Sequence, residues 1–208
     1  MLGLSGMEAS DIIDDHIRDV RITNDALDTR LSIDVSENHD GSVRIWFRDG
    51  TIFLHSQKDS AFLNPDSSEM FRGMQSLTSI DMSGYDASLL QDASGMFSCT
   101  GISRIDLRFL RTATHLEILN GLVSECAHLQ ELDLSPVPTK DVWDISCLCS
   151  GCTALEKLIL MGCSLENITE TGDMLYGCGD VQIFAGPEYM NLLFSGTNLL
   201  DFRRVHRP

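Results

Sequence analysis

Residues Met70–Phe97 read MFRGMQSLTSIDMSGYDASLLQDASGMF, and the Met-Phe pair that opens this stretch closes it again 26 residues later. Steps of 26 residues from Met70, and likewise from Phe71, reach an apolar residue every time. The two columns comprise Met70, Met96, Leu122, Leu148 and Met174, and Phe71, Phe97, Val123, Cys149 and Leu175. Self-similarity at one fixed period is the signature of a stacked-repeat architecture.

Each unit also contains an L-x-x-L-x-L pattern, whose alternate residues share one face of a short strand. A single strand cannot bury this face, whereas stacked copies form a continuous apolar interior. We therefore predict a repeat solenoid, that is, a leucine-rich-repeat-like parallel β ladder with turns or short helices between the strands. The expected strands are residues 77–82, 102–107, 129–134 and 155–160.

The second unit departs from the period, since its Ile102 and Leu107 come one residue early. A single deletion after Phe97 explains the shift, and it places Cys99 in a column with Met74, Cys126, Cys152 and Cys178. A small apolar side chain suits a repeated buried turn. We therefore expect Cys126, Cys152 and Cys178 to be buried, reduced and without a metal.

Residues 1–66 do not repeat, and we expect them to form an N-terminal cap. Glu8–Val20 has apolar residues at helical spacing, which predicts an amphipathic helix. Ser42–His55 alternates around Asp49-Gly50, a strong two-residue turn signal, and so predicts a β-hairpin. Trp46 and Phe53 would share the opposite hairpin face, either as core of the cap or as an exposed contact. The repeats then span residues 67–202, and residues 203–208 form a C-terminal tail.

Composition limits the class of partner. The chain has 208 residues and a formal net charge of −16, and such a surface repels nucleic-acid phosphates and anionic membranes. Its excess of acid also favours a basic partner, although solubility alone could explain it. No stretch has the 18 or so apolar residues of a membrane span. Met1–Ser10 lacks the features of a secretory signal, which predicts either an intracellular protein or a missing native start.

The stretch Met70–Phe97 resembles the repeat of the BspA-like leucine-rich-repeat family of bacterial surface proteins. Ser83, Asp86, Ser88 and Leu90 match the second half of that repeat, and the resemblance extends over roughly residues 67–202. It implies a non-enzymatic adhesion module at the cell surface or secreted, with a cytoplasmic binding protein as the alternative. The implied partner is a protein ligand such as a host matrix or surface protein. A spacer segment that presents other domains is a further alternative.

No catalytic motif is present, and we predict no enzyme activity, cofactor or metal site. Cys147-x-Cys149-x-x-Cys152, with Cys163 nearby, could be a zinc cluster, but four of the chain's cysteines, Cys99, Cys126, Cys152 and Cys178, fit a structural repeat column. Asp81, Asp106 and Asp133 form an acidic column that could hold a cation or could simply face solvent. The residue types therefore indicate binding rather than chemistry.

The side chains between the leucines should point outward and form the contact surface for a protein partner. This surface is polar and mixed in charge at one end and apolar at the other, where it is either an anchor for the partner or covered by the C-terminal segment. The predicted contact residues are Ser79, Asp81, Arg104, Asp106, Arg108, Glu131, Asp133, Lys157, Ile159 and Met161.

Overall fold

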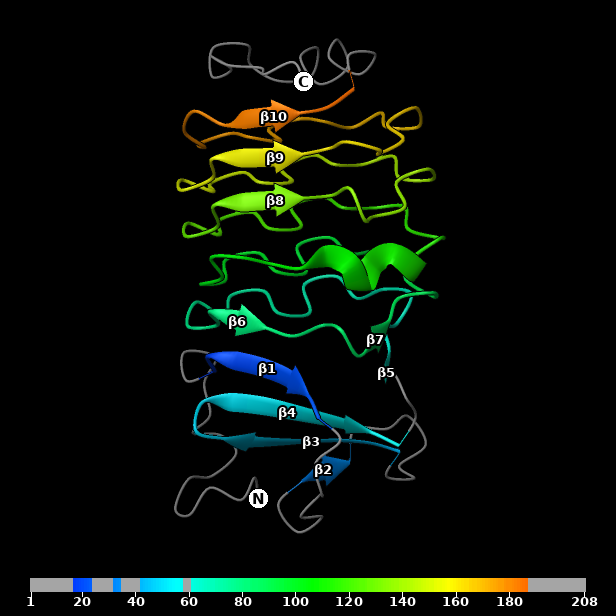
Figure 1. Cartoon of the computed structure of the whole chain (residues 1–208), viewed down its shortest axis with the longest axis vertical. Coiled ribbons are helices and arrows are strands. Elements are labelled where there is room, and N and C mark those ends of the chain that lie inside the picture. The colour runs from blue at the N-terminus through cyan, green and yellow to red at the C-terminus, as the bar shows by residue number, and fades with distance from the viewer. Residues whose placement is uncertain (1–16, 24–31, 35–41, 58–60, 187–208) are drawn as a thin grey trace.

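A computed structural model of the chain describes residues 17–23, 32–34, 42–57 and 61–186. These residues form an elongated stack of short strands and turns, in which successive units lie one above the other (Figure 1). No helix among the described residues has the length and apolar character needed to cross a membrane.

The strands belong to three separate sheets. A mixed sheet has the order β2-β3-β4-β1-β6, a parallel sheet has the order β10-β9-β8, and β5 pairs with β7. The first sheet contains β1 (Asp19–Ile22), β2 (Ile33–Asp34), β3 (Val43–Arg48), β4 (Thr51–Ser56) and β6 (Ser79–Ile80). The others contain β5 (Ala61–Phe62), β7 (Tyr85–Asp86), β8 (Glu131–Asp133), β9 (Lys157–Ile159) and β10 (Gln182–Phe184).

The hairpin predicted from Ser42–His55 is confirmed. β3 and β4 pair antiparallel in register, and the turn residues Asp49 and Gly50 have φ values of 52° and 82°. Two positive φ values give the turn the twist that hairpin strands need. Trp46 lies opposite Phe53, with ring centroids 5.4 Å apart, and both side chains are half-buried. The pair is therefore intermediate between the core and exposed alternatives.

The helix predicted over Glu8–Val20 is wrong where it can be compared, and residues 8–16 lie outside the described residues. Asp19 and Val20 belong to β1, which pairs in parallel with β4 on one side and with β6 on the other. A strand between two neighbours satisfies its backbone groups on both edges, whereas a short helix is marginal on its own. The apolar spacing of Ile17 and Val20 instead reflects their burial against the first repeat unit.

The predicted fold class is wrong. A repeat solenoid with one continuous ladder of L-x-x-L-x-L strands was expected, but the structure has three separate sheets. Almost no helix accompanies them; the named helical element of the described residues is the 3-10 helix η3 (Leu107–Thr112). Segment 102–107 forms no strand, so the strands β6 and β8 on either side of it belong to different sheets. β10 was not among the expected strands, yet it pairs with β9 in register.

The interruption originates at Gly101. Thr100, rather than Cys99, occupies the cysteine column, since it lies 26 residues before Cys126 and its Oγ1 is 3.3 Å from the Cys126 Sγ. Cys99 instead has the left-handed φ of the residue that precedes each column position. The missing residue therefore falls beside Gly101 and not before Cys99. There the backbone passes very close to the preceding unit. A Cβ atom added to Gly101 would lie 2.2 Å from the Gln75 carbonyl oxygen. The extra residue that restores the period lies in the stretch containing η3.

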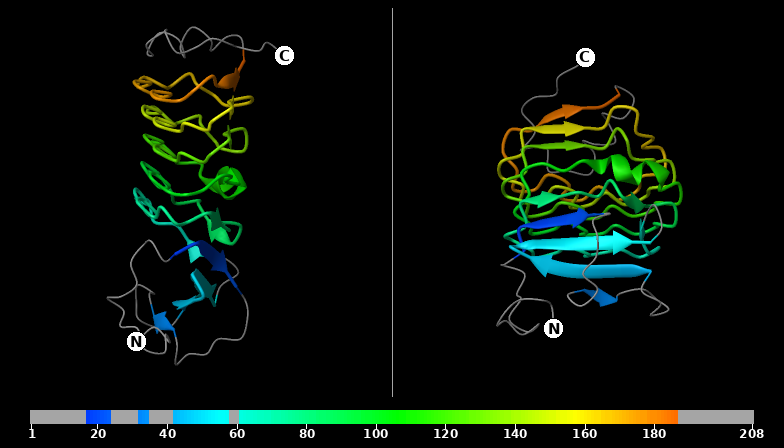
Figure 2. Two further views of the ribbon diagram at one scale, coloured as in Figure 1. Left: turned by 90° about the vertical axis from the view of Figure 1, so that its left-hand side faces the viewer. Right: turned by 60° about the horizontal axis from the view of Figure 1, so that its bottom comes forward.

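A different part of each unit is continuous. Between each pair of consecutive units, four backbone N–H groups donate to carbonyls 25 residues further along the chain. We call this array the turn ladder; its segments are residues 66–73, 92–99, 118–125, 144–151 and 170–176. Figure 2 shows these turns stacked on the side opposite the strands.

Two columns of left-handed residues bend the turn ladder in each unit. One comprises Gly73, Cys99, Glu125, Gly151 and Gly177, and the other comprises Glu69, Gly95, Gly121, Cys147 and Asp173, all with φ between 54° and 82°. Left-handed residues cannot continue a regular strand, which explains why the longest ladder of the molecule is not a β-sheet.

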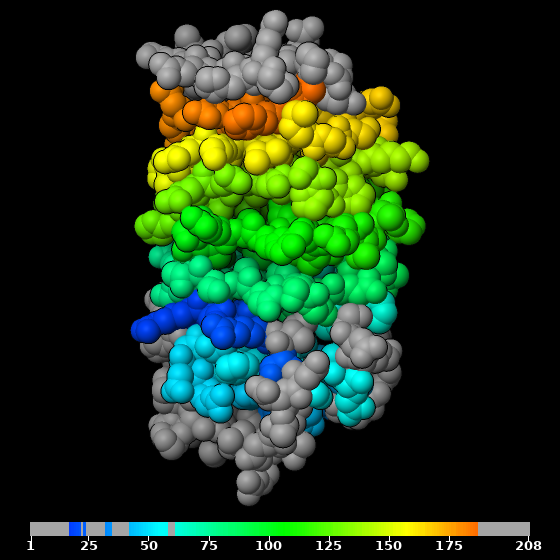
Figure 3. Space-filling model, viewed as in Figure 1, coloured from blue at the N-terminus to red at the C-terminus, as the bar shows by residue number. Residues whose placement is uncertain are grey.

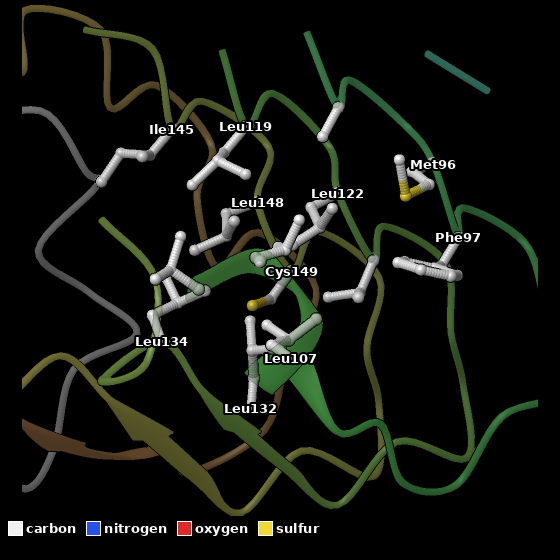
Figure 4. Packing of buried hydrophobic residues seen from close by; sticks show 14 of the residues in the cluster. Met96, Phe97, Leu107, Leu119, Leu122, Leu132, Leu134, Ile145, Leu148 and Cys149 are labelled. Atoms are coloured by element: carbon white, nitrogen blue, oxygen red, sulfur yellow. The ribbon is translucent and has the colours of Figure 1, made fainter. Parts of the chain in front are cut away.

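The apolar core fills the space between the turn ladder and the strands. Leu132, Leu158 and Ile183 lie at the centres of β8, β9 and β10, and each is fully buried. Figure 4 shows Leu132 and Leu134 facing Leu122, Leu148 and Cys149, which come from the turn ladder. The residues of the two repeated apolar columns are therefore buried as expected, except for Met70, which is 39% exposed.

Candidate functional site

We call the side of the stack that carries the strands and η3 the strand face, which is the side seen in Figure 3. Six of the ten predicted contact residues lie in these elements, namely Ser79 in β6, Arg108 in η3, Glu131 and Asp133 in β8, and Lys157 and Ile159 in β9. In β8 and β9, Glu131 lies opposite Lys157 and Asp133 lies opposite Ile159, so two of the predicted columns are formed in register. Ser79 lies in β6, whose partner is β1 rather than the segment that carries Arg104. The face is thus continuous as a surface but interrupted as a sheet.

Two ion pairs order the charges on the strand face. The guanidinium of Arg108 donates from Nη2 to Asp106 Oδ2 at 2.5 Å and from Nε to Oδ1 at 2.9 Å. Lys157 Nζ lies 3.4 Å from Glu131 Oε2, one unit apart. All four side chains are about half exposed or more, so these pairs add little stability. They leave charged groups of both signs available on the surface.

The pKa of the Asp106 carboxyl lies below its ordinary value of 3.8, chiefly because of the hydrogen bonds from the Arg108 side chain and backbone N–H. A lowered pKa in the folded state means that this carboxylate stabilises the fold above pH 3.8 and that the contribution disappears as the pH falls through the folded pKa. Asp106→Asn keeps the Oδ1 acceptor but has no charge to lose. We expect its free energy of unfolding to fall less steeply than that of the wild type below pH 3.8, in urea titrations by circular dichroism; equal slopes would contradict this.

The acidic column has a structural role that the sequence interpretation missed. Asp81, Asp106 and Asp133 each accept, through Oδ1, the backbone N–H two residues ahead, at 2.9, 3.0 and 2.8 Å. The same bond recurs at Asp66, Asp86, Asp92 and Asp144. Such Asx turns bend the chain at a corner. The signal was the recurrent Asp-x-Ser, visible at every one of these positions except Asp106, and it explains part of the acidic composition.

Two hollows open on the strand face beside the interrupted segment. The larger, of about 530 Å³, lies between the first and second units and includes Asp81, Asp106 and Arg108. The smaller, of about 360 Å³, is lined by Arg104, Glu131, Asp133 and Lys157 together with Ile105, Gln130 and Glu156. Seven of the ten predicted contact residues therefore line a hollow.

The apolar end of the face is only partly exposed. Met161 is 42% exposed, whereas Ile159 is half-buried, because Phe184 of β10 lies directly beside it. The sequence reasoning missed β10 since its unit is degenerate. Of the expected apolar anchors, Met161 is the one that the structure leaves open.

The thiols of the cysteine column donate hydrogen bonds to backbone carbonyls. Cys126 and Cys152 are buried and Cys178 is half-buried, so the burial predicted for Cys178 is wrong. All three are free thiols, and each donates its S–H to a carbonyl 29 residues earlier at 3.0 Å. No group of three or more metal-binding side chains occurs in the part of the chain that the structure describes. Each thiol thus satisfies a carbonyl of the preceding unit.

Burial should make the buried thiols of the chain, such as Cys149, Cys152 and Cys163, unreactive. Burial raises the pKa of Cys163 to about 11 and raises that of Cys149 and Cys152 further. Since the thiolate is the reactive form, we expect a thiol reagent at about pH 8 to label Cys152 only as the protein opens. Peptide mapping by mass spectrometry should show the half-buried Cys99, Cys147 and Cys178 modified before the buried thiols, and all seven modified in denaturant. Equal native rates at Cys147 and Cys152 would contradict the burial.

Comparison with known proteins identifies no relative: no family model, no curated protein and no solved structure matches this chain.

Proposed function

We propose that this chain is a non-enzymatic protein-binding module that holds its partner on the strand face. The observation that carries the proposal is the pair of hollows on that face, lined by seven of the residues predicted for contact. Binding sites are concave and combine apolar surface with a few placed polar groups. Both hollows present paired charges at their rims.

The variation between units supports the same face. Some equivalent positions on the strand face differ freely, as in the column Ser79, Arg104, Glu131 and Lys157, whereas the column Asp81, Asp106 and Asp133 is held by its Asx turns. The turn ladder is restricted in addition by two columns of left-handed corners. Side chains that the fold does not require can be used for recognition. We therefore place the partner on the strand face rather than on the turn ladder.

Adhesion at a bacterial cell surface, with a host matrix or surface protein as partner, is the context that we propose from the sequence resemblance. The exposed Met161 and the arginines of the face are residue types common at protein interfaces. A spacer that presents other domains would bind nothing through this face, which makes the two roles separable.

The test measures binding to immobilised, purified extracellular-matrix proteins by biolayer interferometry. Glu131→Lys should weaken binding of any protein captured by the wild type by about tenfold or more, because it reverses a negative charge in the smaller hollow. The matched control is Glu69→Lys, which reverses an exposed glutamate of the turn ladder that is likewise paired with a cation, Arg72. A loss with Glu69→Lys and none with Glu131→Lys would refute the strand face.

A further inference from the structure

The larger hollow is lined by a mostly buried tyrosine whose hydroxyl has no partner among the described residues. Tyr85 lines this hollow and is only 7% exposed. Its hydroxyl has no hydrogen-bond partner among the residues that the structure describes, and burial raises its pKa to about 12, so the phenol stays protonated. The hydroxyl oxygen is not itself sealed from solvent, since the fully buried side-chain oxygens without a partner among the described residues are Asp19 Oδ1 and Thr139 Oγ1. It is therefore open to a ligand atom in the hollow.

Two carboxylates in the same hollow each keep one oxygen open. Asp81 and Asp86 use Oδ1 to accept the backbone N–H groups of Ser83 and Ser88, at 2.9 and 2.8 Å. Within the described residues, neither Oδ2 has a hydrogen-bond partner. Asp106, by contrast, has both oxygens occupied by Arg108. The hollow therefore offers three free acceptors, namely Tyr85 Oη and the two Oδ2 atoms.

The rest of the lining of the larger hollow consists of apolar side chains and the cationic side chain of Arg111. Ile80, Met82 and Phe109 line the hollow, and Met82 and Phe109 are buried. Such a surface suits the aliphatic stem of a long side chain whose charge lies at its end. Arg111 also lines the hollow, and its charge contributes to the lowered pKa of Asp106. Its guanidinium can donate to a carbonyl oxygen of the ligand.

We propose that this hollow binds the side chain of a lysine in an extended segment of the partner, an inference that rests on the proposed function. An ammonium group has three N–H donors and no acceptor, which matches the three free acceptors. Arginine is the poorer match, because its five donors would exceed them. A net charge of −16 attracts a cation to this face and opposes an anion. Arg111 then holds the backbone carbonyl beside the lysine.

The experiment titrates the isotope-labelled full chain with Nα-acetyl-lysine methylamide and follows amide shifts by NMR. We expect saturable shifts confined to residues lining the hollow, within 80–86 and 106–112. The control probe is Nα-acetyl-norleucine methylamide, which has the aliphatic stem without the ammonium group, and it should cause no saturable shift. Equal affinity for the two probes, or shifts that map elsewhere, would overturn the proposal.

Two variants test the acceptors. Asp81→Asn/Asp86→Asn keeps both Oδ1 atoms for the corner bonds and removes the charges, so it should fold and should bind the lysine probe about tenfold more weakly. Asp66→Asn/Asp92→Asn is the matched control, since it changes the same charge at two Asx turns of the turn ladder. Tyr85→Phe should also weaken binding of the lysine probe. It should not lower the melting temperature, because the Tyr85 hydroxyl makes no hydrogen bond with the described residues of the free protein.

These outcomes are separable from those of the proposed function. Unchanged affinity of the lysine probe in Asp81→Asn/Asp86→Asn overturns the lysine assignment, even where the strand face binds a matrix protein. A lysine probe that binds as expected, together with matrix-protein binding that survives both Glu131→Lys and Asp81→Asn/Asp86→Asn, shows that the hollow accepts lysine but refutes the strand face as the partner's binding surface.

Discussion

Replacing Gly101 with alanine should lower the free energy of unfolding by about 3 kcal/mol, a large effect for one methyl group. The added Cβ would lie 2.2 Å from the Gln75 carbonyl oxygen and 3.2 Å from that of Leu77. Both atoms belong to the backbone of the preceding unit, so relief requires moving one unit away from the next. The φ of Gly101 is not among the positive values, which leaves this steric contact as the cause.

Gly172→Ala is the matched control. A Cβ at Gly172 would meet nothing within 4 Å, and its φ is also not positive. This variant should be as stable as the wild type or more stable by up to about 1 kcal/mol, because alanine restricts the unfolded chain. Urea unfolding followed by circular dichroism measures both. Equal free energies of unfolding for Gly101→Ala and Gly172→Ala would contradict the close approach of Gly101 to the backbone of the preceding unit.

Phe97→Ala should destabilise the protein by about 3–5 kcal/mol. Phe97 is fully buried; its ring stacks on Phe71 of the preceding unit at 5.6 Å and meets the edge of Phe109 at 6.4 Å. It therefore joins the first unit, the turn ladder and the 3-10 helix, and its removal leaves a cavity that three elements would have to fill.

Phe62→Ala serves as the comparison, since Phe62 is 52% exposed. Its unfolding free energy should change by about 0.5 kcal/mol or less. A loss for Phe97→Ala no larger than that for Phe62→Ala would contradict the packing of the aromatic cluster.

The sequence predicted the period, the inward-facing residues and the hairpin at Asp49-Gly50, because each depends on local pattern alone. The predicted fold class was wrong because residues 102–107 keep the leucine pattern but do not form a strand. The pattern does not show that the turn before this segment, at Gly101, is one residue shorter than in the other units. Whether a short segment pairs as a strand depends on the units above and below it. Several left-handed positions of the turn ladder are not glycines, as at Cys99 and Glu125, so nothing in the sequence indicated their conformation and the turn ladder was not predicted.

The candidate surface was more predictable than the details of its use. Alternation along β8 and β9 correctly placed Glu131 beside Lys157. It could not show that Asp81 and Asp133 would use one oxygen for a chain corner, or that Tyr85, outside the strands, would line the larger hollow. Those depend on where the chain turns, which single-residue patterns do not specify.

Hydrogen-deuterium exchange of the chain with and without a captured matrix protein tests the central claim most directly, because it locates the contact without any substitution. The account predicts that binding slows exchange in segments 79–86, 104–112, 130–135 and 156–157, which contain the hollow-lining residues of the strand face. Protection confined to the turn-ladder segments 92–99 and 118–125, with the strand face unchanged, would contradict it.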